Sequence, residues 1–272
     1  MQKLILTFSL LLIATALFAL NPKRTYDITP ADFGMDYKEI SIKSTDSTVL
    51  NAWHFIPRKD GKSQKMIILS PSGDGNMEDL IEQAGQFVTL GYQVITYDYR
   101  GYGKSTDFKI SSKFYIYSQF AQDLEAVLDW SQKYDVKLAK DLYGVGIGAG
   151  LSVSLGASKN YVNRVIADGT YATLETVSKR LEEKGEKMMM PIGYDKTTLE
   201  PRFALESKGK YLDKVLLIVA DKDPICKAED AKALAKLNNK ITIFMIKGAD
   251  NKLNFSAHKD DYFKEIKKFL EL

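Results

Sequence analysis

Few side chains in this sequence of 272 residues could act as the general base for a nucleophile. Nucleophilic catalysis needs a hydroxyl or thiol beside a general base. The chain has one cysteine, Cys226, and two histidines, His54 and His258. Asp223, in the stretch ADKDP, could orient such a base, or could simply accept hydrogen bonds within a turn. His, Cys and carboxylate residues nowhere have the spacing of metal ligands, so we expect no metal and no other cofactor.

A glycine-rich stretch, LYGVGIGAG at residues 142–150, stands out because such a turn between a strand and a helix can present one residue at a sharp apex. The apex is Gly146 or, if the register moves by two residues, Gly148. Neither register supplies a hydroxyl or a thiol. Ser152 and Ser154 lie further along the expected helix. A phosphate loop is excluded because no GK[ST] ending follows the glycines.

The segments around this turn alternate between strands and helices. Two early segments, at 37–44 and 49–57, alternate apolar and polar residues, which predicts two antiparallel strands. Continuous apolar runs predict buried strands at 65–70, 92–98, 163–168, 214–221 and 241–247, and another that ends near residue 145. Helical patterns fall at 77–90, 119–134, 149–157, 227–237 and 260–272. We therefore predict an α/β fold with a mostly parallel central sheet and helices on both faces.

Two segments depart from this alternation. Residues 1–20 carry a lysine near the start, an apolar run, and small residues before the polar NPKR. This layout predicts a secretory signal peptide, with a short uncleaved membrane anchor as the alternative. Residues 171–211 are mostly polar, contain MMMP and separate two core strands, so we expect a short helical lid there. The main domain is expected at 25–272.

Bulk composition excludes some classes of partner. With 45% hydrophobic and 27% charged residues, the chain has the composition of a globular domain. The net charge of +3 is small and the lysines are scattered among acids, which argues against a nucleic-acid partner. The single cysteine, Cys226, excludes an intrachain disulfide.

Five segments in order resemble the α/β-hydrolase superfamily. They are PSGDGN at 71–76, VITYDYRGYGKS at 94–105, LYGVGIGAG at 142–150, LLIVADKDPI at 216–225 and FMIKGADN at 244–251. In the family, these positions hold an oxyanion loop, a DYRGYGxS loop, the G-x-S-x-G nucleophile elbow, the acid and the histidine. The resemblance covers nearly all of the chain after the N-terminal segment.

This resemblance implies a triad that has lost two members. Gly146 stands at the position of the serine, and Asn251 at the position of the histidine, while Asp223 retains the acid. Asparagine cannot act as a general base near neutral pH. His258 could replace the histidine only if the intervening loop folds back. The backbone N–H groups of Gly73 and Ile147 would form the oxyanion hole, and backbone donors survive a change of side chain.

Together with the predicted signal peptide, these substitutions predict an exported, catalytically defective hydrolase-like protein. It would keep a pocket for a small acyl or peptide-like ligand, or for a protein partner. The alternative is an active hydrolase, related to esterases, lipases or peptidases, that uses a non-standard residue such as His258. A purely structural role is a third possibility. Contact with a membrane is expected only if the N-terminal segment is uncleaved.

Overall fold

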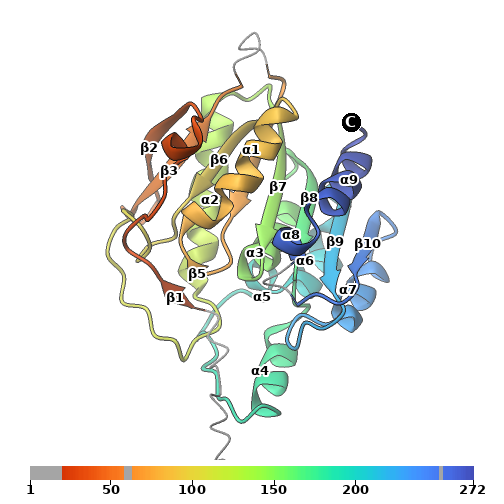
Figure 1. The fold of residues 1–272 in the computed structure, drawn as a ribbon. Helices are drawn as coiled ribbons and strands as arrows, with labels where there is room; N and C mark the ends of the chain where they lie inside the picture. The colour runs from red at the N-terminus through yellow and green to blue at the C-terminus, as the bar shows by residue number, and fades with distance from the viewer. Residues whose placement is uncertain (1–19, 58–62, 251–253) are drawn as a thin grey trace, which may run out of the picture.

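A central sheet of eight strands organises the computed structural model of this chain, which describes residues 20–57, 63–250 and 254–272 (Figure 1). The strand order is β10-β9-β8-β7-β4-β6-β3-β2. Strands β10 to β6 run parallel, and β3 and β2 join the edge antiparallel. The predicted fold class, a mostly parallel sheet covered by helices, is confirmed.

The strands and helices follow the predicted segments closely. The strands of this sheet are β2 (Tyr37–Lys43), β3 (Val49–Phe55), β4 (Lys65–Ser70), β6 (Gln93–Tyr97), β7 (Ala139–Val145), β8 (Val162–Asp168), β9 (Lys214–Ala220) and β10 (Ile241–Ile246). The α-helices are α1 (Ile81–Thr89), α2 (Ser118–Tyr134), α3 (Ile147–Ser158), α4 (Leu174–Glu182), α5 (Lys196–Leu199), α6 (Pro201–Lys208), α7 (Ala228–Ala235), α8 (Asn254–Ala257) and α9 (Lys259–Leu270). Short 3-10 turns lie at Pro30–Phe33, Met77–Leu80 and Gly209–Tyr211.

Two hydrophobic clusters cover the two faces of the sheet. Successive side chains of a strand point to opposite faces, so Ile67 and Leu69 join one cluster while Met66 and Ile68 join the other. Helices α1 and α9 pack with the first cluster, in front of the sheet in Figure 1. Helices α2, α3, α6 and α7 pack with the second. Strands buried on both faces explain the continuous apolar runs in the sequence.

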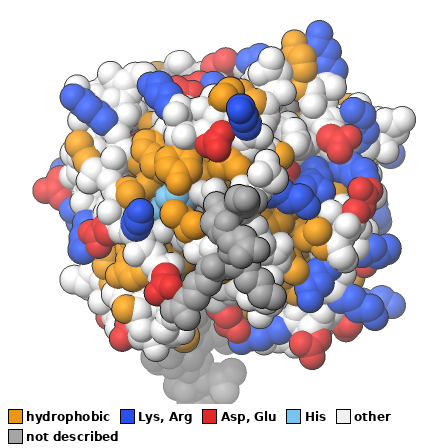
Figure 2. All heavy atoms as spheres, turned by 90° about the horizontal axis from the view of Figure 1, so that it is seen from above, with side chains coloured by type: hydrophobic (Ala, Val, Ile, Leu, Met, Phe, Trp, Pro, Cys, Tyr) orange, Lys and Arg blue, Asp and Glu red, His pale blue; other side chains and the backbone are white. Residues whose placement is uncertain are grey.

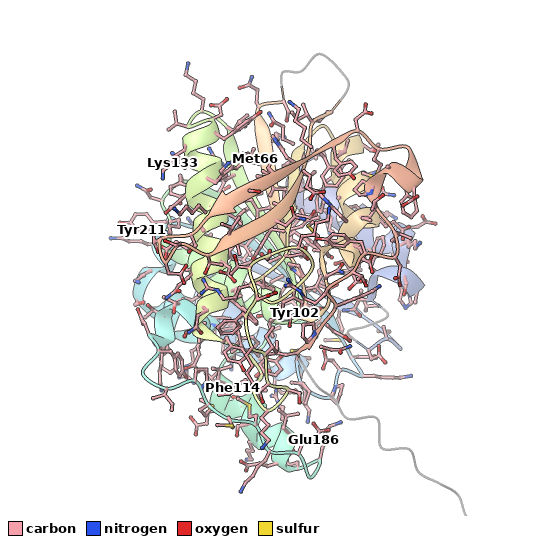
Figure 3. All side chains as sticks on the ribbon, turned by 90° about the vertical axis from the view of Figure 1, so that its left-hand side faces the viewer. Met66, Tyr102, Phe114, Lys133, Glu186 and Tyr211 are labelled. Carbon is pink, nitrogen blue, oxygen red and sulfur yellow. The ribbon has the colours of Figure 1, made fainter. Side chains whose placement is uncertain are left out.

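The segment expected to form a lid holds helices α4, α5 and α6. It meets the segment before α2 through a bridge between Phe114 and Met189, where the N–H of Met189 donates to the carbonyl of Lys113 at 2.7 Å. Phe114 and Glu186 both lie at the lower end of the molecule in Figure 3. The parallel strands run towards this end, but a lid function stays a prediction.

The packed part of the chain begins before residue 25, the start expected for the domain. Leu20 is buried, and Asn21–Pro22 forms a short strand, β1, that pairs in parallel with β5 (Asp74–Gly75). The segment predicted to be a signal peptide, 1–20, otherwise lies outside the described residues. Within the described ranges, no helix has both the length and the apolar character needed to cross a membrane.

The opposite end of the molecule carries charges of both signs. Figure 2 views this end, and blue and red side chains are intermixed on it with orange patches between them. This surface therefore shows no large area of a single charge.

Candidate functional site

A pocket lies at the carboxyl ends of the parallel strands. Its volume is about 570 Å³. Ser72 follows β4, Val145 ends β7, Asp168 ends β8 and Asp223 follows β9, and all four residues line the pocket. Because the ends of parallel strands meet at one edge of a sheet, these four segments converge there although they are distant in sequence. A pocket of this size suits a small molecule.

The glycine-rich turn has its apex at Gly146. This residue links β7 to α3 with φ of 56° and ψ of −118°, and it lines the pocket. A Cβ at Gly146 would lie 3.4 Å from Cβ of Ser72, which is ordinary van der Waals contact. A Cβ at Gly144 or Gly148 would instead lie 2.2 Å or 2.3 Å from a backbone oxygen. The flanking glycines therefore serve close packing, and the apex is the one position with room for a side chain.

The N-terminal strand holds the loop after β4 in place. The N–H of Asn21 and the hydroxyl of Tyr102 both donate to the carbonyl of Gly73, each at 2.8 Å. Of the two predicted oxyanion donors, Ile147 lines the pocket and Gly73 does not. Ile147 begins α3, so its N–H has no acceptor within that helix. The structure thus brings one predicted donor to the pocket, and the pair stays a prediction.

Asp223 lies in the pocket wall with one oxygen bonded and the other without a partner. Oδ1 accepts the N–H groups of Ile225 at 2.7 Å and Cys226 at 2.8 Å. Oδ2 is buried and accepts no hydrogen bond from any described residue. Burial raises the pKa of the Asp223 carboxyl, and the neighbouring charge of Asp250 acts in the same direction. This carboxylate therefore has one oxygen available for a donor.

Neither histidine is among the described residues that line the pocket with Asp223. His258 immediately precedes α9, half-buried, and is not among the described residues that line the pocket. Its N–H donates to the carbonyl of Phe255 and its carbonyl accepts from Tyr262. His54 is buried in β3, 3.0 Å from Oε1 of Gln93. Asn251, at the family's histidine position, lies outside the described residues.

A second buried carboxylate, Asp168, forms part of the pocket floor. Its Oδ2 accepts from the hydroxyl of Tyr262 at 2.7 Å, and its Oδ1 from Nδ2 of Asn254 at 2.6 Å. The Tyr262 hydroxyl also lies 2.9 Å from that of Tyr143. Burial raises the pKa of Asp168 to about 7, and the charge of Asp223 adds to this effect. The carbonyl of Asp168 accepts the N–H of Gly146 at 2.9 Å, which ties this floor to the elbow.

Cys226 lines the pocket as a buried thiol. Its Sγ lies 3.7 Å from the hydroxyl of Tyr115. Burial raises the pKa of the Cys226 thiol well above its usual value, and the charge of Asp223 contributes. A thiol of this kind stays protonated near neutral pH and is a poor nucleophile.

Comparison with known proteins gives partial matches in sequence and nearly complete matches in structure. No family model matches the chain. Protein bem46 of Schizosaccharomyces pombe is 26% identical over 149 residues, which are 54% of this chain and 48% of that protein. The chain thus spans about half the length of this curated relative.

Solved structures with this arrangement of strands and helices share little sequence with the chain. An esterase of Pyrococcus furiosus superposes with a TM-score of 0.70 at 18% identity, covering 93% of this chain and 96% of that one. The α/β hydrolase GrgF of a Penicillium species gives a TM-score of 0.64 at 17% identity, covering 87% of this chain and 98% of that one. The chain has the α/β-hydrolase fold. The predicted resemblance to the fold of this superfamily is therefore confirmed.

Within the α/β-hydrolase fold, the elbow and the acid loop lie at the edge of the sheet where the sequence segments predicted them. Gly146 at the apex carries no side chain, and the pocket wall beside it holds Asp223. The roles of both residues stay predictions, because no comparison tests individual residues. Among the described residues, no group of three or more His, Cys, Asp or Glu side chains could hold a metal ion.

Sequence reasoning missed the carboxylate of Asp168. The run NRVIAD could have indicated this site. Asp168 ends a buried strand, and the ends of the parallel strands lie at the same edge of the sheet as the elbow. The partners of Asp168 are harder to find. Asn254 and Tyr262 come from the C-terminal helices, 86 and 94 residues further along the chain.

Proposed function

We propose that this chain is an exported protein of the α/β-hydrolase fold that binds a small acyl or peptide-like ligand without hydrolysing it. One observation carries this proposal. Gly146, at the apex of the elbow, has the positive φ of the turn and no side chain to attack a carbonyl carbon. Without a nucleophile and its base, such a site retains only about 10³ to 10⁴-fold acceleration over water.

The shape of the site supports ligand binding. The pocket of about 570 Å³ opens at the elbow, and Ile147 places the first N–H of α3 beside it. The Pyrococcus furiosus structure is that of an esterase, which supports an acyl or peptide-like ligand for the same fold. Export rests on the predicted signal peptide at residues 1–20.

No observation favours an active hydrolase that uses His258, because this side chain does not line the pocket in the described part of the chain. Cys226 lines it, but its thiol is buried and its pKa is raised. Neither residue supports a replacement for the triad.

The proposal is tested by restoring the missing side chains. The purified wild type is expected to leave short p-nitrophenyl esters intact and to resist labelling by a fluorophosphonate probe. The double variant Gly146→Ser with Asn251→His is expected to react with the probe, because Gly146 has room for a Cβ and Oδ2 of Asp223 lacks a donor. Gly146→Ala with Asn251→His is the matched control, since it adds a Cβ and a histidine but no hydroxyl.

Two results would contradict the proposal. Fluorophosphonate labelling of the wild type would show that another residue acts as nucleophile. Equal ester turnover by the wild type and the restored variant would show that Gly146 does not mark the reactive position. Circular dichroism of each variant establishes that the fold is retained before activities are compared.

A further inference from the structure

A buried carboxylate oxygen in the pocket lacks a hydrogen-bond donor. Asp223 is 7% exposed, and its Oδ1 is held by the N–H groups of Ile225 and Cys226. Asp223 is one of the residues that line the pocket, and its buried Oδ2 accepts no hydrogen bond from any described residue. A buried acceptor left unpaired costs about 1–3 kcal/mol, and more when it is charged. A ligand that donates to Oδ2 would recover this cost.

The acidic and basic side chains among the described residues that line the pocket are all carboxyl groups. Its ionisable carboxylates are all aspartates: Asp74, Asp79, Asp168, Asp223 and Asp250. No Lys, Arg or His is among the described residues of the lining. This arrangement favours a cation and opposes an anion.

The arginine whose charge acts on Asp223 is already engaged by other groups. Arg180 lowers the pKa of Asp223, but burial outweighs this effect. The guanidinium pairs with Asp230, and its Nη1 also donates to the carbonyl of Ile225. Arg180 therefore does not supply the hydrogen bond that Oδ2 lacks.

Part of the wall is apolar and aromatic. Leu80, Ile147 and Ile225 line the pocket together with Tyr115 and Phe255. Aliphatic and aromatic side chains accommodate the hydrocarbon part of a ligand, and aromatic faces attract ammonium groups. The empty position at Gly146 adds space where a serine would otherwise project. The described part of the pocket thus combines carboxyl groups with apolar and aromatic side chains.

We propose that the pocket binds a small organic cation, whose ammonium group donates to Oδ2 of Asp223 and whose hydrocarbon part lies against the apolar wall. This inference rests on the proposed function, because it specifies the ligand of a pocket that no longer performs hydrolysis. A peptide-like ligand with a free amine belongs to this class, whereas a carboxylate-bearing ligand does not.

Three probes of matched shape test the proposal by isothermal titration calorimetry: 4-phenylbutylammonium, 4-phenylbutanol and 4-phenylbutyrate. The ammonium is expected to bind at least about tenfold more tightly than the alcohol, and the carboxylate more weakly still. Asp223→Asn is expected to reduce ammonium binding by about tenfold or more while leaving alcohol binding nearly unchanged. Asp221→Asn is the matched control. It removes one negative charge two residues away, where the exposed side chain accepts from the N–H of Gly248 and does not line the pocket.

Three results would overturn the cation proposal. They are equal binding of the ammonium and the alcohol, preferred binding of the carboxylate, and equal loss of affinity in Asp223→Asn and Asp221→Asn. Absence of binding by all three probes counts against it as well. The outcome is separate from the test of the proposed function, because ester hydrolysis by the wild type would overturn that function without altering the preference for a cation.

Discussion

The hydroxyl of Tyr262 donates a hydrogen bond of 2.7 Å to Oδ2 of Asp168, and both residues are buried beneath the pocket. Tyr262 belongs to α9 and Asp168 ends β8, so this bond attaches the last helix to the pocket floor. The backbone of Asp168 also accepts from Gly146. The elbow, the floor and the C-terminal helix are therefore one connected unit.

Asp168 should make stability depend on pH. Burial raises its pKa from 3.8 to about 7. As pH rises through this window, the unfolded chain releases the proton first, so the free energy of unfolding falls. In urea unfolding, the wild type should therefore lose stability relative to Asp168→Asn between about pH 4.5 and about pH 7.5. A difference that stays constant across this range would exclude a raised pKa at Asp168.

The variant Tyr262→Phe separates the effect of the hydrogen bond on the pKa of Asp168 from the effect of burial. The Tyr262 hydroxyl lowers the pKa of Asp168, in opposition to burial. Tyr262→Phe should therefore raise that pKa further and extend the pH dependence upwards. An unchanged profile in Tyr262→Phe would show that the hydroxyl does not stabilise the ionised carboxylate.

The glycines of the elbow should differ in their tolerance of a methyl group. At Gly148 a Cβ would lie 2.3 Å from the carbonyl oxygen of Ser70, so Gly148→Ala should cost about 3 kcal/mol or more. At Gly146 space is available, and Gly146→Ala should cost about 1–3 kcal/mol from its positive φ alone. Urea unfolding of the two variants checks this order. Equal destabilisation would mean that the apex is as crowded as its neighbours.

Local sequence patterns predicted most of the elements at this edge. The run KMIILS matches β4 residue for residue, because a strand buried on both faces must be continuously apolar. The predicted helix at 149–157 begins two residues late, since α3 starts at Ile147 directly after the apex. Helix ends depend on the backbone conformation of single residues, which hydrophobic periodicity does not report.

Local sequence patterns could not predict the contacts between segments that are distant in sequence. Asn21 pairs with Asp74, 53 residues away, and thereby binds the N-terminal strand to the loop after β4. Nothing in the composition of NPKR indicates a strand. The sequence likewise could not show whether Gly146 or Gly148 is the apex of the turn. The two glycines belong to the same repeat, and only the space around each Cα in the folded chain distinguishes them.

The thiol of Cys226 should react slowly in the folded protein. It is 3% exposed, and burial raises its pKa well above the usual value. Since the thiolate is the reactive form, labelling by 5,5′-dithiobis(2-nitrobenzoate) should be at least about 100-fold slower in buffer than in denaturant. Rapid stoichiometric labelling of the native protein would contradict this assignment and restore Cys226 as a candidate nucleophile.

The buried pair of Arg100 and Asp123 should show strong coupling. Nε and Nη2 of Arg100 donate to Oδ1 of Asp123 at 2.9 and 2.7 Å, and its backbone N–H donates to Oδ2 at 3.0 Å. This contact fixes the loop after β6, from which Tyr102 supports the carbonyl of Gly73. Arg100→Met leaves the buried carboxylate of Asp123 unpaired and should cost about 3–5 kcal/mol. Asp123→Leu leaves Arg100 its ion pair of 2.6 Å with Asp46, so this change should cost less. The double variant removes both charges of the buried pair and should cost clearly less than the sum of the two. Urea unfolding of all four proteins measures the coupling, and additive costs would mean that the pair is solvated in solution.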